Sequence, residues 1–206
     1  MNMRHSWITA LAAAPLLALT LLPAGAAPAT AIVPASGKVT CPVASGTGGV
    51  NPALTHAGGG GGSIKINFHG KLASNCTSAI INPQGDKVIG GTFAGGGYYT
   101  HTNANSCANF DGPDVVGLIQ VTITWKTTST PIAPTTIVYK NNLNTNSTPL
   151  VLMTLNAPPG TATKTGSFHA LGTPVLTQLQ TNIPGTCPPS TPPIATFVIV
   201  GGKVSV

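Results

Sequence analysis

The sequence predicts an all-β fold, an antiparallel β-sandwich or barrel-like domain stapled by two disulfides. Three observations predict it: apolar and polar residues alternate over many short segments, turn residues separate these segments at spacings of about ten residues, and four cysteines follow an export signal. Helical patterns are nearly absent after that signal. Many short strands at this spacing are typical of a sandwich or a barrel.

Two segments show the alternation most clearly. Within residues 63–72, apolar side chains occupy positions 64, 66, 68 and 72 while polar side chains occupy the odd positions, as in a half-buried strand. Within residues 115–126, apolar side chains occupy positions 115, 119, 121, 123 and 125, so we expect a central strand there. Further strands are expected at residues 38–43, 87–93, 135–140, 149–155, 163–171, 175–181, 194–200 and 203–206.

Clusters of glycine and proline predict where the strands end. Turns are expected at residues 82–86, 158–160, 184–185 and 201–202. The glycines at 90–91 and 95–97 predict bulges or a wide loop. The glycine run at 58–62 lacks the Lys-Ser/Thr ending of a phosphate-binding loop and precedes a strand, so we interpret it as a loop between strands.

Residues 1–31 have the layout of a secretory signal peptide. Arg4 supplies positive charge, an apolar run follows, and small residues then form two cleavage patterns, which predict a cut after Ala26 or after Ala31. The apolar run is shorter than the roughly 20 residues of a membrane-spanning helix, which argues against an uncleaved anchor. No later stretch is long and apolar enough to span a bilayer. We therefore expect residues 32–206 to be one β domain, secreted or associated with the cell envelope.

All four cysteines, Cys41, Cys76, Cys107 and Cys187, lie after the signal. An even number in an exported chain predicts two disulfides, and the close cysteine pairs of zinc sites are missing. Three pairings exist. We expect Cys41 to pair with Cys76, because the two lie on neighbouring predicted strands, and Cys107 to pair with Cys187, which ties the middle of the chain to its C-terminal strands.

Acidic residues are scarce. The chain contains Asp86, Asp111 and Asp114 and no glutamate, whereas lysines are more numerous. Hydrolysis of a glycan usually needs two carboxylates in different environments, and all three aspartates lie in predicted turns exposed to solvent. A calcium site at Asp111 and Asp114 is an alternative, but two carboxylates are few for that ion.

We assign no catalytic residue, cofactor or metal. His56, His69, His101 and His169 could serve as bases, but no G-x-S-x-G motif accompanies them. Their spacing also fails to place two of them on one strand for a metal. We expect each of these histidines to be a surface or turn residue.

One cationic stripe stands out, formed by Lys65, His69 and Lys71 on the polar face of residues 63–72. With Tyr98 and Tyr99, which we expect to be exposed, this stripe could hold a polyanion or stack on a sugar ring. These five residues are the candidate binding site. The alternative is an ordinary solvated strand face.

Several short motifs occur along this chain in an order that resembles a known group of proteins. The order Gly37-Lys38-Val39-Thr40-Cys41, Asn51-Pro52-Ala53-Leu54, Cys76, Cys107 and Ile123-Thr124-Trp125-Lys126 is similar to a group of short secreted, disulfide-bonded β proteins of actinobacteria. The resemblance covers most of the chain after the signal. It implies export, strands and disulfides, but it implies no activity and transfers no functional residue.

The leading functional expectation is a secreted or cell-envelope β domain with a non-enzymatic binding or structural role. Candidate partners are a cell-wall polymer or another envelope protein, with no specific nucleic acid. The alternatives are a secreted hydrolase whose histidine-centred site forms only in the fold, and a small-molecule carrier. A hydrolase requires convergent histidine and aspartate side chains, a carrier requires a large apolar pocket, and a binding module requires an exposed patch.

Overall fold

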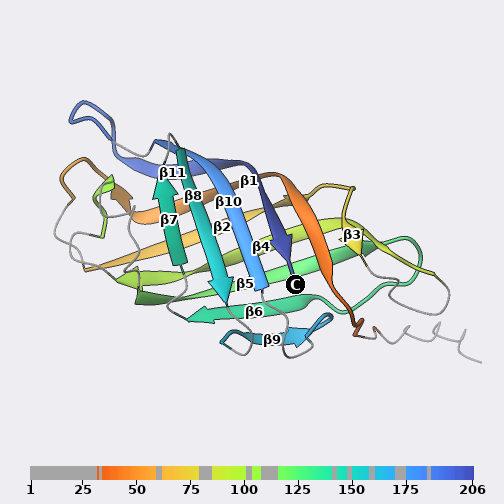
Figure 1. The fold of residues 1–206 in the computed structure, drawn as a ribbon. Helices are drawn as coiled ribbons and strands as arrows, with labels where there is room; N and C mark the ends of the chain where they lie inside the picture. The colour runs from red at the N-terminus through yellow and green to blue at the C-terminus, as the bar shows by residue number, and fades with distance from the viewer. Residues whose placement is uncertain are drawn as a thin grey trace, which may run out of the picture. The chain divides into compact units, whose positions relative to one another are not determined.

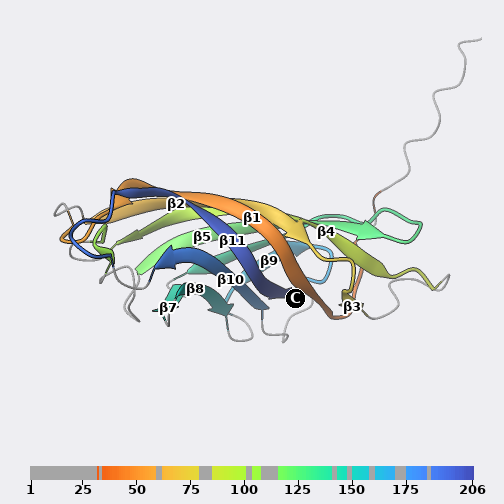
Figure 2. The same ribbon diagram turned by 90° about the horizontal axis from the view of Figure 1, so that it is seen from above.

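The described strands form one antiparallel sheet that curls into a half-barrel (Figures 1 and 2). The computed structural model describes residues 32, 34–58, 62–78, 85–100, 104–107, 116–140, 143–147, 150–157, 161–169, 175–184 and 187–206. The strands are β1 (Val39–Leu54), β2 (Ser63–Leu72), β3 (Thr77–Ser78), β4 (Val88–Thr100), β5 (Val116–Thr127), β6 (Thr135–Lys140), β7 (Leu143–Ser147), β8 (Leu150–Ala157), β9 (Thr163–Gly166), β10 (Val175–Pro184) and β11 (Ile194–Ser205). The all-β prediction is confirmed.

The strand order explains the curl. Across the sheet the strands follow the order β7-β8-β10-β11-β1-β2-β4-β5-β6-β9, and β3 pairs with the start of β1. Five strands separate β10 from β6 in this order, yet the Tyr139 hydroxyl of β6 lies 3.0 Å from Oγ1 of Thr177 in β10. The sheet must therefore bend until its two halves face each other, which is the barrel-like form of the prediction, built from one sheet instead of two.

The core fills the concave side of this sheet. Alternate residues are buried along most of β5 and along β10, and β5 buries Ile119, Val121, Ile123 and Trp125 as predicted. On β2 the buried positions are likewise those that the alternation predicted. The opposite side chains of these strands project from the convex side, which we call the outer face.

Two strands run much further along the chain than the sequence suggested. β1 continues to Leu54 and β4 to Thr100, because the glycines in their second halves pair in regular register with both neighbouring strands. The predicted turn at 201–202 and the predicted loop at 95–97 are wrong, since both lie within strands. A bulge does occur next to Gly90, where the register between β4 and β5 shifts. β3 and β7 were not predicted, because neither carries a clear apolar alternation.

Aromatic rings cover several of these glycines on the concave side. A Cβ atom on Gly95 would overlap the ring of Phe68, and one on Gly70 would overlap the ring of Phe93. Gly48 lies in the same way under Phe197. Glycine allows neighbouring strands to bend while a ring from the next strand fills the vacated space. These positions therefore contribute to the curvature of the sheet.

Both disulfides have the predicted pairing. Cys41 in β1 is bonded to Cys76 just before β3, with 4.1 Å between their Cα atoms, and Cys107 is bonded to Cys187 across 5.8 Å. Two disulfides are typical of proteins from an oxidising compartment. Among the described residues there is no helix long and apolar enough to cross a membrane.

Candidate functional site

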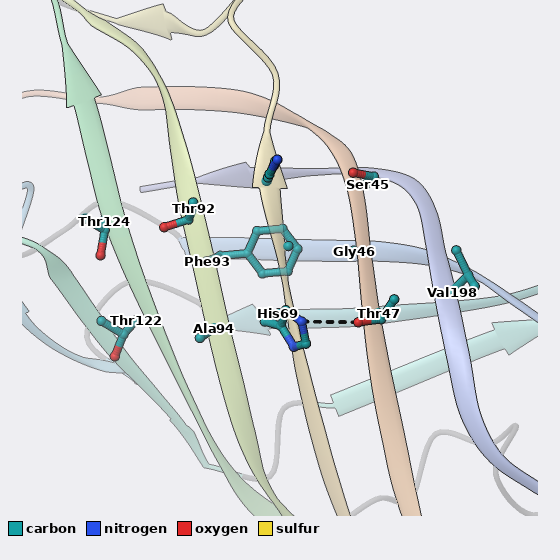
Figure 3. Close-up of a pocket in the computed structure, with 12 residues that line it drawn as sticks. Ser45, Gly46, Thr47, His69, Thr92, Phe93, Ala94, Thr122, Thr124 and Val198 are labelled. Carbon is teal, nitrogen blue, oxygen red and sulfur yellow. Dashed lines mark hydrogen bonds between the residues drawn. The ribbon is translucent and has the colours of Figure 1, made fainter.

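The candidate site lies on the outer face where β11, β1, β2, β4 and β5 run side by side. Cross-strand pairing places Val198, Thr47, His69, Ala94 and Thr122 in one row over these five strands (Figure 3). Neighbouring strands lie about 4.8 Å apart, so side chains along such a row are close neighbours. The row joins segments that are far apart in the sequence.

The predicted cationic stripe is present on β2. Lys65, His69 and Lys71 are all exposed, and Asn67 lies between them on the same face. Alternate residues of a strand are spaced about 6.6 Å apart, so Lys65 and Lys71 lie roughly 20 Å from each other along β2. The stripe is therefore long enough to contact an extended ligand.

The two candidate tyrosines lie on opposite faces of β4. Tyr98 is 49% exposed and pairs with Lys65, so it extends the outer face beside the stripe. The expectation that Tyr99 is exposed is wrong. Tyr99 is buried on the concave side, where its hydroxyl donates a hydrogen bond to the carbonyl of Ala104 at 3.1 Å, and burial raises the pKa of its phenol. Strand alternation makes this outcome unavoidable, because consecutive residues cannot share a face.

Two adjoining grooves indent the outer face around His69. The first has a volume of about 650 Å³ and lies over β1, β2, β4 and β5. Its lining includes Lys71, Gly70, Ala94, Val198 and several threonines. Figure 3 shows the threonines Thr47, Thr92, Thr122 and Thr124 around His69. The second groove, of about 610 Å³, lies over β11, β1 and β2. Its polar lining includes Asn51, Asn67 and Asn182.

A hydroxyl–imidazole pair separates the two grooves. Oγ1 of Thr47 lies 3.3 Å from Nε2 of His69, and both residues line both grooves (Figure 3). A nucleophile of this kind needs a base that a third group orients. No carboxylate of the described residues contacts His69, so the pair lacks this orienting partner within the described part of the chain.

The other histidines do not join this site. Nδ1 of His56 contacts the carbonyl of Cys187, and Nδ1 of His169 lies 2.7 Å from the carbonyl of Gly166. Each is thus paired with backbone on a different part of the sheet. His101 lies outside the described residues. Among the described residues, no three His, Cys, Asp or Glu side chains cluster as a metal site would require.

Asp86 is a structural residue and not the solvated turn residue that the sequence suggested. It is 5% exposed, and Oδ1 accepts a hydrogen bond from the Thr128 hydroxyl at 2.8 Å while Oδ2 accepts one from the Thr130 amide at 3.2 Å. The carboxylate therefore joins the start of β4 to the loop after β5. Asp111 and Asp114, with the calcium site considered there, lie outside the described residues.

The charge on the outer face follows from this burial. Asp86 is the one acidic side chain in the described segments, and it is buried. It does not reach the part of the outer face that carries the cationic stripe and the two grooves, which we call the strip. Lys65, Lys71 and Lys126 are all exposed on β2 and β5. Within the described residues, the face carries positive charge, hydroxyls and amides without an opposing carboxylate, which favours an anionic ligand.

Several residues of this face were not singled out from the sequence. Thr47 was missed because the glycine-rich part of β1 did not resemble a strand. Asn67 and Gln120 belong to alternating segments, so their exposure could be predicted, but their proximity could not. Only the register of β2, β4 and β5 brings them to the two sides of Gly96.

The sequence matches no family model, and no curated protein and no solved structure is significantly similar to it.

Proposed function

We propose that this chain is a secreted or cell-envelope β domain with a non-enzymatic binding role, and that its outer face holds an anionic polymer of the envelope. The observation that carries the proposal is the cationic stripe on β2. Its residues Lys65, His69 and Lys71 lie beside two grooves, and no acidic side chain is exposed among the described residues. Charge complementarity selects an anionic ligand.

The shape of the site supports an extended ligand. The stripe runs about 20 Å along β2. The two grooves beside it are open and adjoin at His69. A polymer can contact several shallow positions at once and gain affinity from their sum, whereas a small molecule needs one deep pocket. The two disulfides and the signal-like N-terminus support a location outside the cytoplasm.

The hydrolase alternative has one supporting observation, the contact between Thr47 and His69. Its weakness is the missing third group, because an unassisted imidazole has less orientation and less stabilisation of its charged form. The carrier alternative needs an enclosed apolar pocket, whereas the concave side is packed with buried residues such as Tyr139 and Phe93. Binding on the outer face requires neither feature.

The test measures polymer binding by the purified secreted protein. Isothermal titration with polygalacturonate and with poly-L-glutamate, both polyanions, should show binding that weakens as salt is added, and neutral dextran should not bind. The double variant Lys65→Gln/Lys71→Gln should lower the affinity for both polyanions by about tenfold, because it removes two positive charges from the stripe.

Lys203→Gln is the matched control. Lys203 is exposed near the C-terminal end of β11, where it pairs with Pro42 of β1. It lines neither groove, so the substitution removes one positive charge from outside the site. It should bind as the wild type does. A wild type that binds neither polyanion, or a double variant with unchanged affinity, would overturn the proposed function. Capture of an envelope protein at the same face instead of a polymer would also overturn it.

A further inference from the structure

We propose that the outer face contains a subsite for one acidic pyranose, a sugar unit bearing a carboxylate or a phosphate, above Gly96 and against the ring of Tyr98. This inference rests on the proposed function and names the class of polymer. It assigns the polymer as a glycan and assigns a stacking residue to the site.

Gly96 forms the floor of this subsite. On β4 it pairs with Asn67 of β2 on one side and with Gln120 of β5 on the other, so two exposed amides flank a position without a side chain. Beyond Asn67, the next position in the row is Gly49 of β1. The row therefore alternates amide-bearing residues with glycines. The amide of Asn67 lies over Gly49, with Oδ1 3.3 Å from where a Cβ atom would stand, and Gly96 has no side chain of its own to cover the backbone beside Tyr98.

Tyr98 supplies an aromatic surface next to Gly96. It is the next outer-face residue of β4 after Gly96, and 49% of its surface is exposed. Leu118, which pairs with it on β5, is also exposed at 37%. Together the two side chains form a small apolar surface with polar residues around it, a feature that ligand-binding faces share.

Lysines lie on both sides of this apolar pair. Cross-strand pairing gives the row Asn51, Lys65, Tyr98, Leu118 and Lys140 over five strands. A sugar ring resting on Tyr98 would thus have an ammonium group on either side and the amides of Asn67 and Gln120 one pleat away. The ammonium groups match an acidic substituent, and the amides match ring hydroxyls, since an amide both donates and accepts.

The same chemistry disfavours a nucleic acid. Binding of single strands requires a continuous basic groove with several stacking aromatics, because successive bases each need a platform. Here the described aromatic residues other than Tyr98 are buried, and the hydroxyls and amides of the strip outnumber its lysines. One ring between two cations fits one sugar unit of a longer acidic glycan.

The experiment compares polymers that share charge but differ in chemistry. Wild-type protein and the variants Tyr98→Ala, Tyr98→Phe and Gln120→Ala are titrated with polygalacturonate, poly-L-glutamate and oligo-dT. Val200→Ala, an exposed apolar residue on β11 outside the strip, is the control. Circular dichroism of each variant confirms that it is folded.

Tyr98→Ala should weaken polygalacturonate binding by about tenfold, and Gln120→Ala should weaken it less, while both leave poly-L-glutamate binding unchanged. Tyr98→Phe should bind like the wild type, because the ring remains. If Tyr98→Ala affects both polyanions equally, affects neither, or if oligo-dT binds more tightly than the glycan, the subsite is overturned while the proposed function can stand. Loss of all polyanion binding in the wild type would overturn both.

Discussion

The ring of Phe197 in β11 lies directly over the backbone of Gly48 in β1, at a point where the two residues pair across the sheet. A Cβ atom at Gly48 would overlap the ring itself and would also approach the carbonyl of Asn67 in β2. Gly48 is therefore a packing requirement of the curled sheet. Its missing side chain is the space that the aromatic ring occupies.

Gly48→Ala should lower the free energy of unfolding by about 1–3 kcal/mol, because the added methyl overpacks the ring and the neighbouring backbone. Gly201→Ala is the matched control within a strand. A Cβ atom at Gly201 meets only the end of the Gln180 side chain, at 3.4 Å, so little destabilisation is expected. Urea denaturation measures both. Equal stability of the two variants would contradict the packing role of Gly48.

Two buried tyrosines predict a loss of stability at alkaline pH. Burial raises the pKa of Tyr99 and of Tyr139 above the usual value near 10. The folded state therefore keeps both protons at a pH where the unfolded chain releases them. Their contribution to stability is complete below about pH 10 and falls by about 1.4 kcal/mol per pH unit for each tyrosine above it.

Denaturation curves between pH 8 and pH 12 test this dependence. The variants Tyr99→Phe and Tyr139→Phe remove one titrating group each, so each should show a shallower alkaline decline than the wild type. The slope is compared rather than the stability at neutral pH, because Tyr139→Phe also removes the contact with Thr177. An unchanged slope in both variants would show that these phenols are not what destabilises the protein.

Each disulfide should contribute strongly to stability. The bridges Cys41–Cys76 and Cys107–Cys187 close loops of 35 and 80 residues. In the chain-entropy description, each bridge restricts the unfolded state by roughly 4 kcal/mol. Replacing either pair by alanine should lower the denaturation midpoint markedly. Peptide mapping without reduction should recover the same two links, and a peptide joining Cys76 to Cys107 would refute the pairing.

Asp86→Asn should lower the free energy of unfolding by about 1–3 kcal/mol. Both carboxylate oxygens accept hydrogen bonds, from Thr128 and Thr130, and an amide offers only one acceptor oxygen. Thr128→Ser keeps the hydroxyl and serves as the control. A screen with ester, peptide, glycan and phosphate substrates should show no turnover that depends on Asp86. Wild-type activity that disappears in a folded Asp86→Asn protein would support the hydrolase alternative.

Secreted material should begin near Ala27 or Ile32, because small residues precede both positions in the pattern that signal peptidase recognises. Intact-mass measurement of protein from the culture medium decides between the two sites. Recovery of a secreted species that still carries Met1 would contradict the proposed processing.

Prediction from sequence succeeded where a pattern is local. The alternation in β2 and β5 identified both strands and their buried faces, because side chains of a strand point to opposite sides in turn. It failed in the second halves of β1 and β4. There the alternating apolar residue is replaced by glycine, and the side chain that fills the core comes from the adjacent strand, so the local pattern disappears.

For the candidate site, the local pattern again predicted some features and missed others. The sequence identified the stripe of Lys65, His69 and Lys71, since these residues share one face of one strand. The sequence did not show that Tyr99 points into the core while Tyr98 points outward. The expected strand ended at residue 93, so strand alternation was not applied to these two tyrosines. The sequence also placed Asp86 in a solvated turn, whereas two hydrogen bonds from the loop after β5 hold it in the interior.

The sequence by itself determined the all-β class and the strands with clear alternation, because both depend on spacing along the chain. It left three cysteine pairings open and favoured the one that the structure confirms. The tertiary structure decided the rest. Curling one sheet, rather than packing two, depends on rings such as Phe197 meeting glycines such as Gly48 across strands. The row that brings Lys65, Tyr98 and Gln120 onto one surface likewise depends on strand register, and register is fixed by pairing between segments that lie far apart in sequence.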